Sequence, residues 1–325
     1  MSRQLSYAKA ILEATDQAMA LCPEVIVLGQ LVDTKSGIFG TTTGLVDKYG
    51  LSRVQDFPVS ENLMTATAMG ASLTGLRPVI AHQRLDFMLY SLDAIANWLA
   101  LWRFKSNGKS AMPVTIRTIV GKGWGQGPQH SKSLHSWFAH LPGLRVAVPA
   151  TAYDAKGLLL ESIFSESPAI FVEGRGLYSM TDEVPEEPYR VRFGQAVIRR
   201  EGIDVTLVAI GNLVPVALKA AAILEKEGID VEVVDPRTLC PLDRKTICDS
   251  AFKTRRLVVA DPAWHSFGAA GEIISTVVEN LGDKLRAKPV RMTLPDSHTP
   301  MSMALEPEYY VDETDIVAAV KQTLK

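Results

Sequence analysis

The amino-acid sequence predicts an α/β fold with two domains, each a mainly parallel sheet flanked by helices. Short apolar runs typical of buried strands alternate with longer stretches of helical periodicity along nearly the whole chain. A length of 325 residues suits roughly two domains of ordinary size. The stretch 179–192 is rich in proline and acidic residues and is typical of a linker. We therefore expect one domain over residues 1–178 and a second over residues 193–325.

Strand and helix patterns alternate in the first domain. The stretch 7–21 places apolar side chains along one helical face, and the apolar run 25–28, ended by Gly29, is typical of a buried parallel strand. Ser60 is the expected N-cap of a helix over 63–73. The other expected strands are 54–59, 79–81, 114–117, 144–148 and 169–172. The other expected helices are 88–104 and 154–165.

The second domain repeats this alternation. Its expected strands are 204–210, 231–234, 257–260 and 290–294, and its expected helices are 215–227, 269–281 and 313–324. Alternation of this kind gives a parallel sheet with helices on both faces. In such open sheets, ligands bind beyond the carboxyl ends of the strands, so we expect the functional residues there.

Composition excludes several classes of protein. A formal net charge of -2 and a pI near 6.3 argue against a nucleic-acid binder, which usually carries a basic face. Cys22, Cys240 and Cys248 form no Cys-x-x-Cys pair and fit a reducing compartment. The first nine residues are polar, unlike a signal peptide, and no apolar run reaches the ~18 residues of a membrane span. We expect a cytoplasmic protein that binds neither nucleic acid nor membrane.

The segment Pro58-Val59-Ser60-Glu61 lies where a strand ends and a helix begins. In the simplest interpretation, Ser60 caps the helix and Glu61 complements its dipole. In the functional interpretation, the carboxylate of Glu61 serves a ligand at the carboxyl end of the strand. The residue types alone favour the first.

Four glycines occupy every second position over 121–127, after the strand expected at 114–117. The spacing is not the dinucleotide-binding fingerprint, and no helix pattern follows it. The nearby stretch 107–110 ends like a phosphate loop, but the first glycine of that motif would have to stand at Arg103. The run is therefore either a mobile surface loop or a lid over a substrate channel.

His130 follows this glycine run directly. A single histidine is more often a packed or surface residue than a catalytic one. One that follows a flexible loop at a strand end is a better candidate, because imidazole transfers protons near neutral pH.

A polar stretch also follows the strand expected at 79–81. It contains His82, Gln83, Arg84, Asp86 and Phe87. In the simplest interpretation Asp86 is a cap and Phe87 a core residue. The guanidinium of Arg84 could instead pair with a substrate carboxylate, or form a salt bridge to Asp86 or to a partner chain.

Three segments together resemble the beta subunit of the thiamin-diphosphate-dependent 2-oxoacid dehydrogenases, a transketolase-like family that includes the pyruvate, branched-chain and acetoin enzymes. They are DFPVSENLMTATAMGASLTGLRPV, PVTIRTIVGKGWGQGPQHSKSLHSWFAHLPGLRVAVPATAYDAKGLLL and EGIDVTLVAIGNLVPVALKAAAILEKEGIDVEVVDPRTLCPLD. The resemblance runs over nearly the whole chain. It implies a pyrimidine-type thiamin-binding domain over 1–178 and a transketolase C-terminal domain over 193–325.

The resemblance also implies roles for individual residues. Glu61 would contact the aminopyrimidine ring of the cofactor, Phe87 would lie against that ring, and His130 would face the reacting carbon. A carboxyl group suits the first role because the ring nitrogen must be protonated before the cofactor can be activated. The remaining assignments are Gln83 and Leu31 to cofactor binding, and Arg84 and His82 to the substrate.

The chain departs from the family at several positions. Gln30 stands where the family has a glutamate after the first strand, and Asp261 stands in an altered stretch where relatives have His-Glu. Some relatives hold a potassium ion with backbone carbonyls. The corresponding carbonyls here belong to Val114, Ser162, Ile163, Ser165 and Ser167, and the usual Asp and Asn of that segment are missing. These departures leave the substrate open.

The sequence also contains no Gly-Asp-Gly segment, which holds Mg²⁺ and the cofactor's diphosphate in thiamin enzymes. We therefore expect an alpha-type partner chain that carries the diphosphate and Mg²⁺, in a heterotetramer with a beta–beta contact. A lipoyl acyltransferase core is a further expected partner. The implied reaction is oxidative decarboxylation of a 2-oxoacid with transfer of the acyl group to lipoamide. The alternatives are half of a split transketolase-like carboligase and a non-catalytic subunit.

Overall fold

The computed structural model describes residues 2–123 and 125–325. Their contacts form two compact units. Unit 1 comprises the chain up to Gly121 together with Trp137–Phe193, and unit 2 comprises Lys122–Ser136 together with Gly194–Lys325. The segment Lys122–Ser136, although it follows a strand of unit 1, therefore packs with unit 2.

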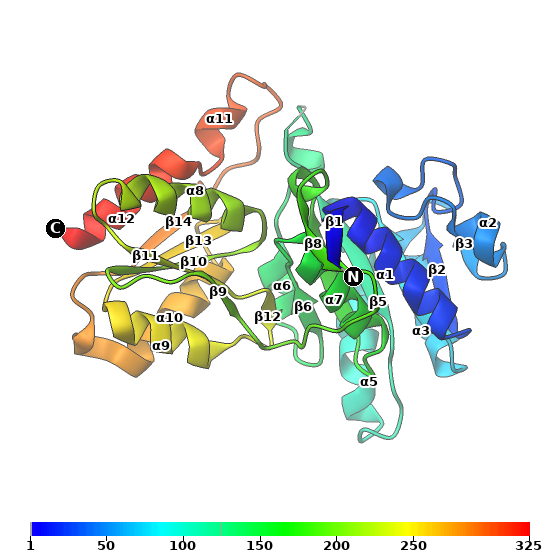
Figure 1. The fold of residues 1–325 in the computed structure, drawn as a ribbon. Helices are drawn as coiled ribbons and strands as arrows, with labels where there is room; N and C mark the ends of the chain where they lie inside the picture. Colours follow the sequence, from blue (N-terminus) through cyan, green and yellow to red (C-terminus); the bar gives the residue numbers. More distant parts are fainter. Residues whose placement is uncertain (1, 124) are drawn as a thin grey trace. The chain divides into compact units, whose positions relative to one another are not determined.

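The strands of unit 1 run side by side in the order β6-β7-β5-β4-β2-β3, and all their pairings are parallel (Figure 1). They are β2 (Val25–Gly29), β3 (Val54–Asp56), β4 (Arg77–His82), β5 (Thr115–Val120), β6 (Arg145–Ala147) and β7 (Ala169–Gly174). Buried β-branched and aliphatic residues fill these strands, as expected for a sheet covered on both faces. The predicted parallel sheet is confirmed.

Helices cover both faces of this sheet. The helices α1 (Tyr7–Leu21) and α7 (Ala152–Ile163) pack together, and their core includes Val79 and Ala81 of β4. Since side chains alternate along a strand, His82 points to the opposite face, where it contacts Thr65 of α3 (Glu61–Leu73). The remaining α-helices are α2 (Leu45–Tyr49), α4 (Leu85–Met88), α5 (Ala100–Lys105) and α6 (His135–Ala139). The first two residues of α6 belong to unit 2 and the rest to unit 1. The short 3-10 turns are η1 (Ile38–Gly40), η2 (Leu89–Ser91), η4 (Gly127–Gln129) and η5 (Arg175–Leu177).

Two features of unit 1 differ from the sequence-based expectation. Ser60 stands at the N-cap of α3, yet its hydroxyl makes no capping hydrogen bond to the described residues. The expected helix 88–104 is interrupted by a π-helical segment, η3 (Ala94–Leu99), before α5 begins. Such a widening of the helix has no signature in apolar periodicity.

The stretch 179–192, predicted as a linker, contains a strand. There β8 (Thr181–Pro185) pairs antiparallel with β1 (Ser2–Ser6), and Val184 and Val191 are buried. This stretch is therefore attached to unit 1 through β8 and Val191, while most of its side chains are exposed.

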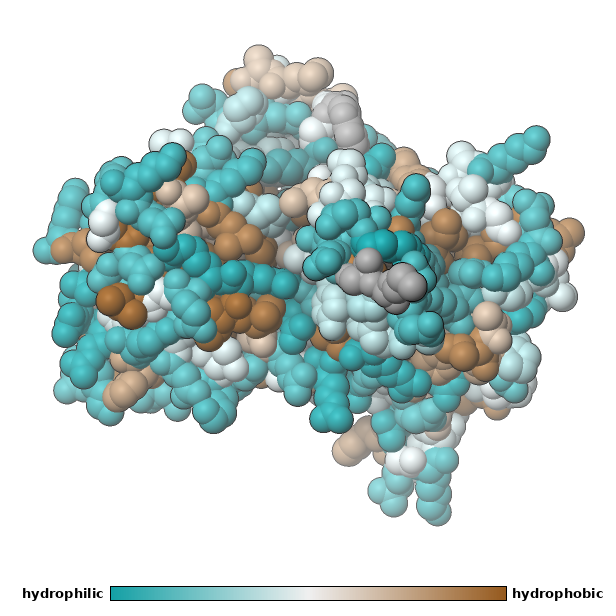
Figure 2. All heavy atoms as spheres, viewed as in Figure 1, coloured by the Kyte–Doolittle hydropathy of each residue, from teal (hydrophilic) through white to brown (hydrophobic). Residues whose placement is uncertain are grey.

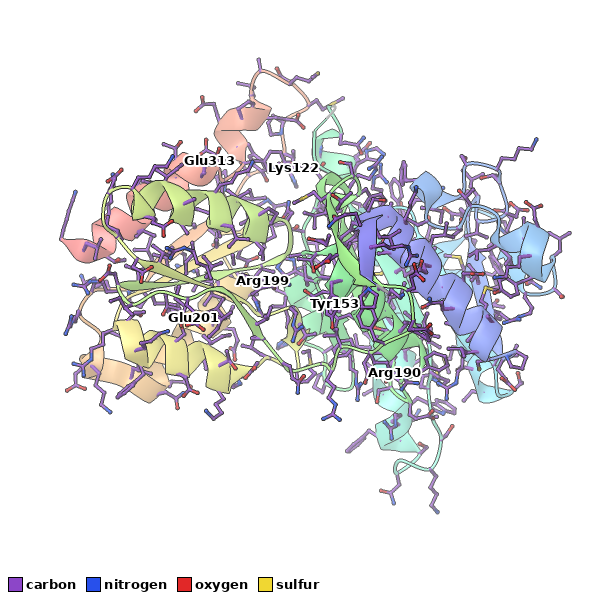
Figure 3. All side chains as sticks on the ribbon, viewed as in Figure 1. Lys122, Tyr153, Arg190, Arg199, Glu201 and Glu313 are labelled. Carbon is purple, nitrogen blue, oxygen red and sulfur yellow. The ribbon has the colours of Figure 1, made fainter. Side chains whose placement is uncertain are left out.

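Unit 2 has the strand order β14-β13-β10-β11-β9, parallel except where β9 runs antiparallel to β11. Arg199 of β9, which Figure 3 labels, donates a hydrogen bond from Nη2 to Oδ2 of Asp235, at the end of β11, over 2.8 Å. The strands of this sheet are β9 (Val197–Arg200), β10 (Val205–Ala209), β11 (Val231–Asp235), β13 (Leu257–Trp264) and β14 (Val290–Leu294); the short strand β12 (Thr238–Cys240) is not part of it. The helices are α8 (Val214–Glu225), α9 (Arg244–Thr254), α10 (Ala269–Leu281), α11 (Glu306–Tyr309) and α12 (Glu313–Leu324), with 3-10 turns η6 (Gly211–Leu213) and η7 (Gly282–Lys284).

Hydrophilic residues dominate the face shown in Figure 2, with scattered hydrophobic patches. Within the described parts of the chain, none of the helices has both the length and the apolar character needed to cross a membrane.

Candidate active site

The residues predicted to bind the cofactor follow three neighbouring strands of unit 1. Because β4, β2 and β3 are adjacent and parallel, the segments that follow them lie at the same edge of the sheet. Hydrogen bonds join these segments: the amide of Leu31 donates to Asp56, and Nε2 of Gln83 donates to the carbonyl of Gln30 over 3.3 Å. The structure thus brings Leu31, Gln83 and Glu61 to one edge.

Glu61 is the first residue of α3 and is only 8% exposed. Its carboxylate makes no hydrogen bond to the residues that the structure describes, and its oxygens are not among the fully buried atoms that lack a partner, so they reach solvent. A carboxylate at this edge without a partner in its own chain is suited to a donor that lies outside the chain. A protonatable ring nitrogen of a bound cofactor would satisfy it, and the residues present fit that group.

Two apolar side chains belong to the segments that follow the neighbouring strands β2 and β4 at the same edge. Leu31 is 53% exposed, and its backbone has a positive φ of 60°, which is uncommon for residues other than glycine. Phe87 lies in the short helix α4 and is half-buried. An exposed leucine held in a strained conformation and an aromatic ring at a strand end are suited to packing against a flat ligand.

His82 lies in the interior behind this edge. It is 3% exposed, and its Nε2 atom is 3.5 Å from the hydroxyl oxygen of Thr65. Burial lowers the pKa of His82 to about 3, so the ring is neutral at physiological pH. A ring with so low a pKa is poorly suited to proton transfer near neutral pH. The assignment of His82 to substrate binding stays a prediction.

Arg84 is also buried, and it stacks on Phe39. Its guanidinium lies 5.1 Å from the centre of that ring, and Arg175 lies 4.7 Å from it. Burial lowers the pKa of Arg84, with Tyr178 and Asp86 acting in the opposite direction. Sequence reasoning missed Phe39 and Arg175; the only local signal is an aromatic residue between glycines in the loop after β2.

His130 belongs to the segment that packs with unit 2. Its Nδ1 atom lies 3.1 Å from the carbonyl oxygen of Gln126. Because a carbonyl only accepts, Nδ1 carries the hydrogen in that contact. The assignment of His130 to proton transfer stays a prediction.

The carbonyls predicted for a potassium ion already have partners. Arg77 donates from its Nη1 atom to the carbonyls of Ile163 and Ser165, over 3.3 and 3.1 Å. The carbonyls of Val114, Ser162 and Ser167 accept from Ala169 N, Ser165 N and Ser165 Oγ, respectively. A carbonyl has a second lone pair, but the charge of Arg77 at two of the five opposes a cation there. The structure does not favour this site.

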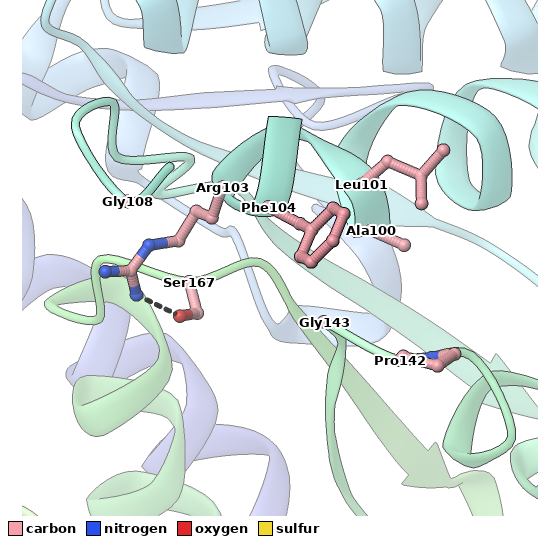
Figure 4. A pocket seen from close by; sticks show the side chains of 8 residues that line it. All are labelled: Ala100, Leu101, Arg103, Phe104, Gly108, Pro142, Gly143 and Ser167. Atoms are coloured by element: carbon pink, nitrogen blue, oxygen red, sulfur yellow. Dashed lines mark hydrogen bonds between the residues drawn. The ribbon is translucent and has the colours of Figure 1, made fainter. Parts of the chain in front are cut away.

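A cavity of about 570 Å³ lies elsewhere in unit 1 (Figure 4). It is lined by Ala100, Leu101, Arg103, Phe104, Gly108, Pro142, Gly143 and Ser167. Pro142 and Gly143 precede β6 and Ser167 precedes β7, so the cavity lies at the amino-terminal edge of the sheet. It is separate from the edge that carries Glu61.

Both halves of the chain match known domains. Residues 3–181 match the transketolase pyrimidine binding domain, and residues 194–316 match the transketolase C-terminal domain. Together with two parallel-sheet units, these matches define the class of the protein as transketolase-like.

Relatives of known name are similar over the full length. The chain is 41% identical over 335 residues to the acetoin:2,6-dichlorophenolindophenol oxidoreductase subunit beta of Cupriavidus necator, covering 100% of this chain and 99% of that one. It is 37% identical over 323 residues to the pyruvate dehydrogenase E1 component subunit beta of Staphylococcus epidermidis, covering 99% of each. A solved split gene transketolase, an inactive beta4 tetramer, superposes with a TM-score of 0.79 at 26% identity and 98% coverage of both chains.

The chain therefore belongs to the family of beta subunits of the thiamin-diphosphate-dependent 2-oxoacid dehydrogenases. The family and fold class predicted from sequence are confirmed. The individual site residues stay predictions.

Proposed function

We propose that this chain supplies the aminopyrimidine-binding half of an active site shared with an alpha-type subunit, for oxidative decarboxylation of a 2-oxoacid and transfer of the acyl group to lipoamide. The observation that carries the proposal is the carboxylate of Glu61, which makes no hydrogen bond to the described residues and lies at the ligand-binding edge of a domain that matches the pyrimidine-binding model. Relatives named for acetoin and pyruvate oxidation support the reaction class.

Each candidate residue has a task in this proposal. Glu61 holds a proton at the ring nitrogen of the cofactor, while Phe87 and Leu31 pack against the ring and Gln83 fixes the neighbouring loop. His130 is the candidate acid–base group at the reacting carbon, and Arg84 is the candidate for contact with the substrate. When bound, thiamin diphosphate supplies the nucleophile and the electron sink for decarboxylation.

The other half of the site would come from a partner. Among the described residues, no group of three or more His, Cys, Asp or Glu side chains is placed to hold a metal ion. A diphosphate requires a hard cation with oxygen ligands, so the alpha-type subunit would hold it with Mg²⁺. The beta4 tetramer of the split transketolase supports a beta–beta contact, and a lipoyl acyltransferase core would receive the product. We assign the assembly to the cytoplasm.

The test is to purify the chain with its co-transcribed alpha-type partner and to screen 2-oxoacids and acetoin with an artificial electron acceptor. We expect acceptor reduction that requires both chains and thiamin diphosphate, and acyl transfer to lipoamide. No reduction with any substrate, in a complex that binds the cofactor, would contradict the proposal.

A second candidate is half of a split transketolase-like carboligase, favoured by the TM-score of 0.79 to the split gene transketolase. Adding an aldehyde acceptor to the same complex separates the two. A carboligase forms a new C–C bond without reducing the electron acceptor, whereas a dehydrogenase reduces the acceptor without the aldehyde.

A further inference from the structure

A buried histidine–aspartate pair lies at the carboxyl-terminal end of the segment that carries His130. The Nε2 atom of His135 lies 2.8 Å from Oδ1 of Asp261, and the two side chains are 1% and 0% exposed. His135 begins α6, and Asp261 lies in β13, so the contact joins positions 126 residues apart in the sequence. Neither residue has a role in the proposed chemistry.

Asp261 is held rigidly by its own domain. Its Oδ1 atom also accepts from the amide of Ala263 over 3.1 Å, and its Oδ2 atom accepts from the amide of Ala270, in the first turn of α10, over 2.9 Å. A Cβ atom on Gly268 would lie 2.8 Å from the same Oδ2, so the carboxylate fills its place tightly. Burial alone would raise the pKa of Asp261. His135 and the two amides together lower this pKa by more, so it lies below the usual value and the carboxylate is charged.

The beginning of the segment is anchored on unit 2 as well. A Cβ atom on Gly127 would lie 2.4 Å from Cγ of Met301, and a Cβ on Gly125 would lie 3.0 Å from the Met301 carbonyl. Both glycines have positive φ, so no other residue suits this close approach. Lys122, labelled with Glu313 in Figure 3, lies 4.6 Å from the centre of the Tyr310 ring.

His130 therefore lies between two attachments to unit 2. We infer that His135 and Asp261 are positioning residues, which fasten the His130 segment to the second domain. The inference rests on the role proposed for His130. A donor at position 135 matters to this fastening, because without it the buried carboxylate of Asp261 loses one of the three hydrogen bonds that it accepts.

Two substitutions in the assembled complex test the inference. His135→Gln keeps a nitrogen donor at about the reach of Nε2, and His135→Leu removes it. His265→Gln is the matched control, since His265 is an exposed histidine of the same unit whose Nδ1 atom contacts Thr293 over 3.0 Å. Hydrogen exchange is followed for the amides of residues 125–134, together with kcat and KM for the 2-oxoacid.

We expect exchange over 125–134 to accelerate about tenfold or more in His135→Leu, and to stay within about twofold of the unsubstituted chain in His135→Gln and His265→Gln. We also expect kcat to fall in the leucine variant and to recover in the glutamine variant, with KM nearly unchanged. Unchanged exchange in His135→Leu would overturn the inference. Equal acceleration over β10, β11 and β13 would also overturn it, because the pair would then serve general stability.

The exchange measurement does not depend on the reaction. If His130→Ala is fully active while exchange changes as expected, the role proposed for His130 fails and the fastening stands. If His130→Ala is inactive and exchange in His135→Leu is unchanged, the role proposed for His130 stands and the fastening by His135 and Asp261 fails.

Discussion

The guanidinium of Arg117 donates hydrogen bonds to both carboxylate oxygens of Glu173, over 2.7 and 3.1 Å, in the interior of unit 1. The two residues lie on the adjacent strands β5 and β7, and their side chains are 2% and 0% exposed. Tyr178 donates to the same carboxylate, and Arg117 also donates to Thr41 in the loop after β2. The pair thus connects the core of the sheet to the loops at its carboxyl edge.

Breaking this pair should be costly. We expect Glu173→Gln to lower the free energy of unfolding by about 3–5 kcal/mol, because it leaves a buried guanidinium without its counter-charge. The measurement is denaturant unfolding of the chain. The control is Glu272→Gln, which removes the exposed contact of Glu272 with Arg244 and should cost less than about 1 kcal/mol. If the two variants lose the same free energy of unfolding, the buried pair contributes no more to stability than the exposed one.

The buried, neutral His82 predicts a particular loss of stability in acid. Its pKa is about 3 in the folded chain and 6.5 for an ordinary histidine, so the unfolded chain takes up the proton first. The contribution is fully present above about pH 6.5 and is lost as the pH falls toward 3, by up to about 1.4 kcal/mol per pH unit. Between pH 6.5 and 5, the unsubstituted chain should therefore lose about 1.6 kcal/mol more than His82→Gln. The measurement is denaturant unfolding of the unsubstituted chain, His82→Gln and the control His265→Gln at the two pH values. If all three proteins lose the same free energy of unfolding, the prediction for His82 is wrong.

The contacts of Arg77 predict indifference to potassium. Since its guanidinium donates to the carbonyls of Ile163 and Ser165, a monovalent cation has little to add at this place. We expect the melting temperature to change by less than about 1 °C when potassium chloride is replaced by tetramethylammonium chloride at equal ionic strength. A rise of several degrees that is specific to potassium would establish the ion site predicted from the family.

Binding of the cofactor to the isolated chain should be weak. The sequence lacks the Gly-Asp-Gly segment that holds Mg²⁺ and the diphosphate in thiamin enzymes, so we expect the isolated chain to hold the diphosphate poorly. Calorimetry with thiamin diphosphate and Mg²⁺ should show no site with a Kd below about 1 μM in the chain alone, and tight binding once the alpha-type partner is added. A sub-micromolar site in the isolated chain would contradict the shared active site.

Strong local patterns made much of the fold predictable. The predicted helices 7–21, 269–281 and 313–324 match α1, α10 and α12, because their apolar periodicity and end residues agree. The strands β1 and β8 were not predictable. Their sequences, SRQLS and TDEVP, are short and polar, and they pair across more than 170 positions. No local pattern reveals such a pairing.

The site was predictable in part for the same reason. Residues at strand ends, such as Glu61 and Gln83, follow from the order of strands and from the family resemblance. The pairing of His135 with Asp261 and of Arg77 with Ser165 joins residues far apart in the chain, and it depends on packing that no motif encodes. Their chemistry becomes visible only in three dimensions.

The most direct test of the account is exchange of the thiazolium proton of thiamin diphosphate in the assembled complex, measured by quenched-flow NMR. If Glu61 holds the proton that activates the cofactor, Glu61→Gln should slow this exchange by about 10²–10⁴-fold while folding changes little. The matched control is Glu313→Gln, another glutamate in the first turn of a helix, which should exchange at the rate of the unsubstituted complex. Exchange in Glu61→Gln within about threefold of that rate would contradict the account, because Glu61 would then be only a helix-start residue.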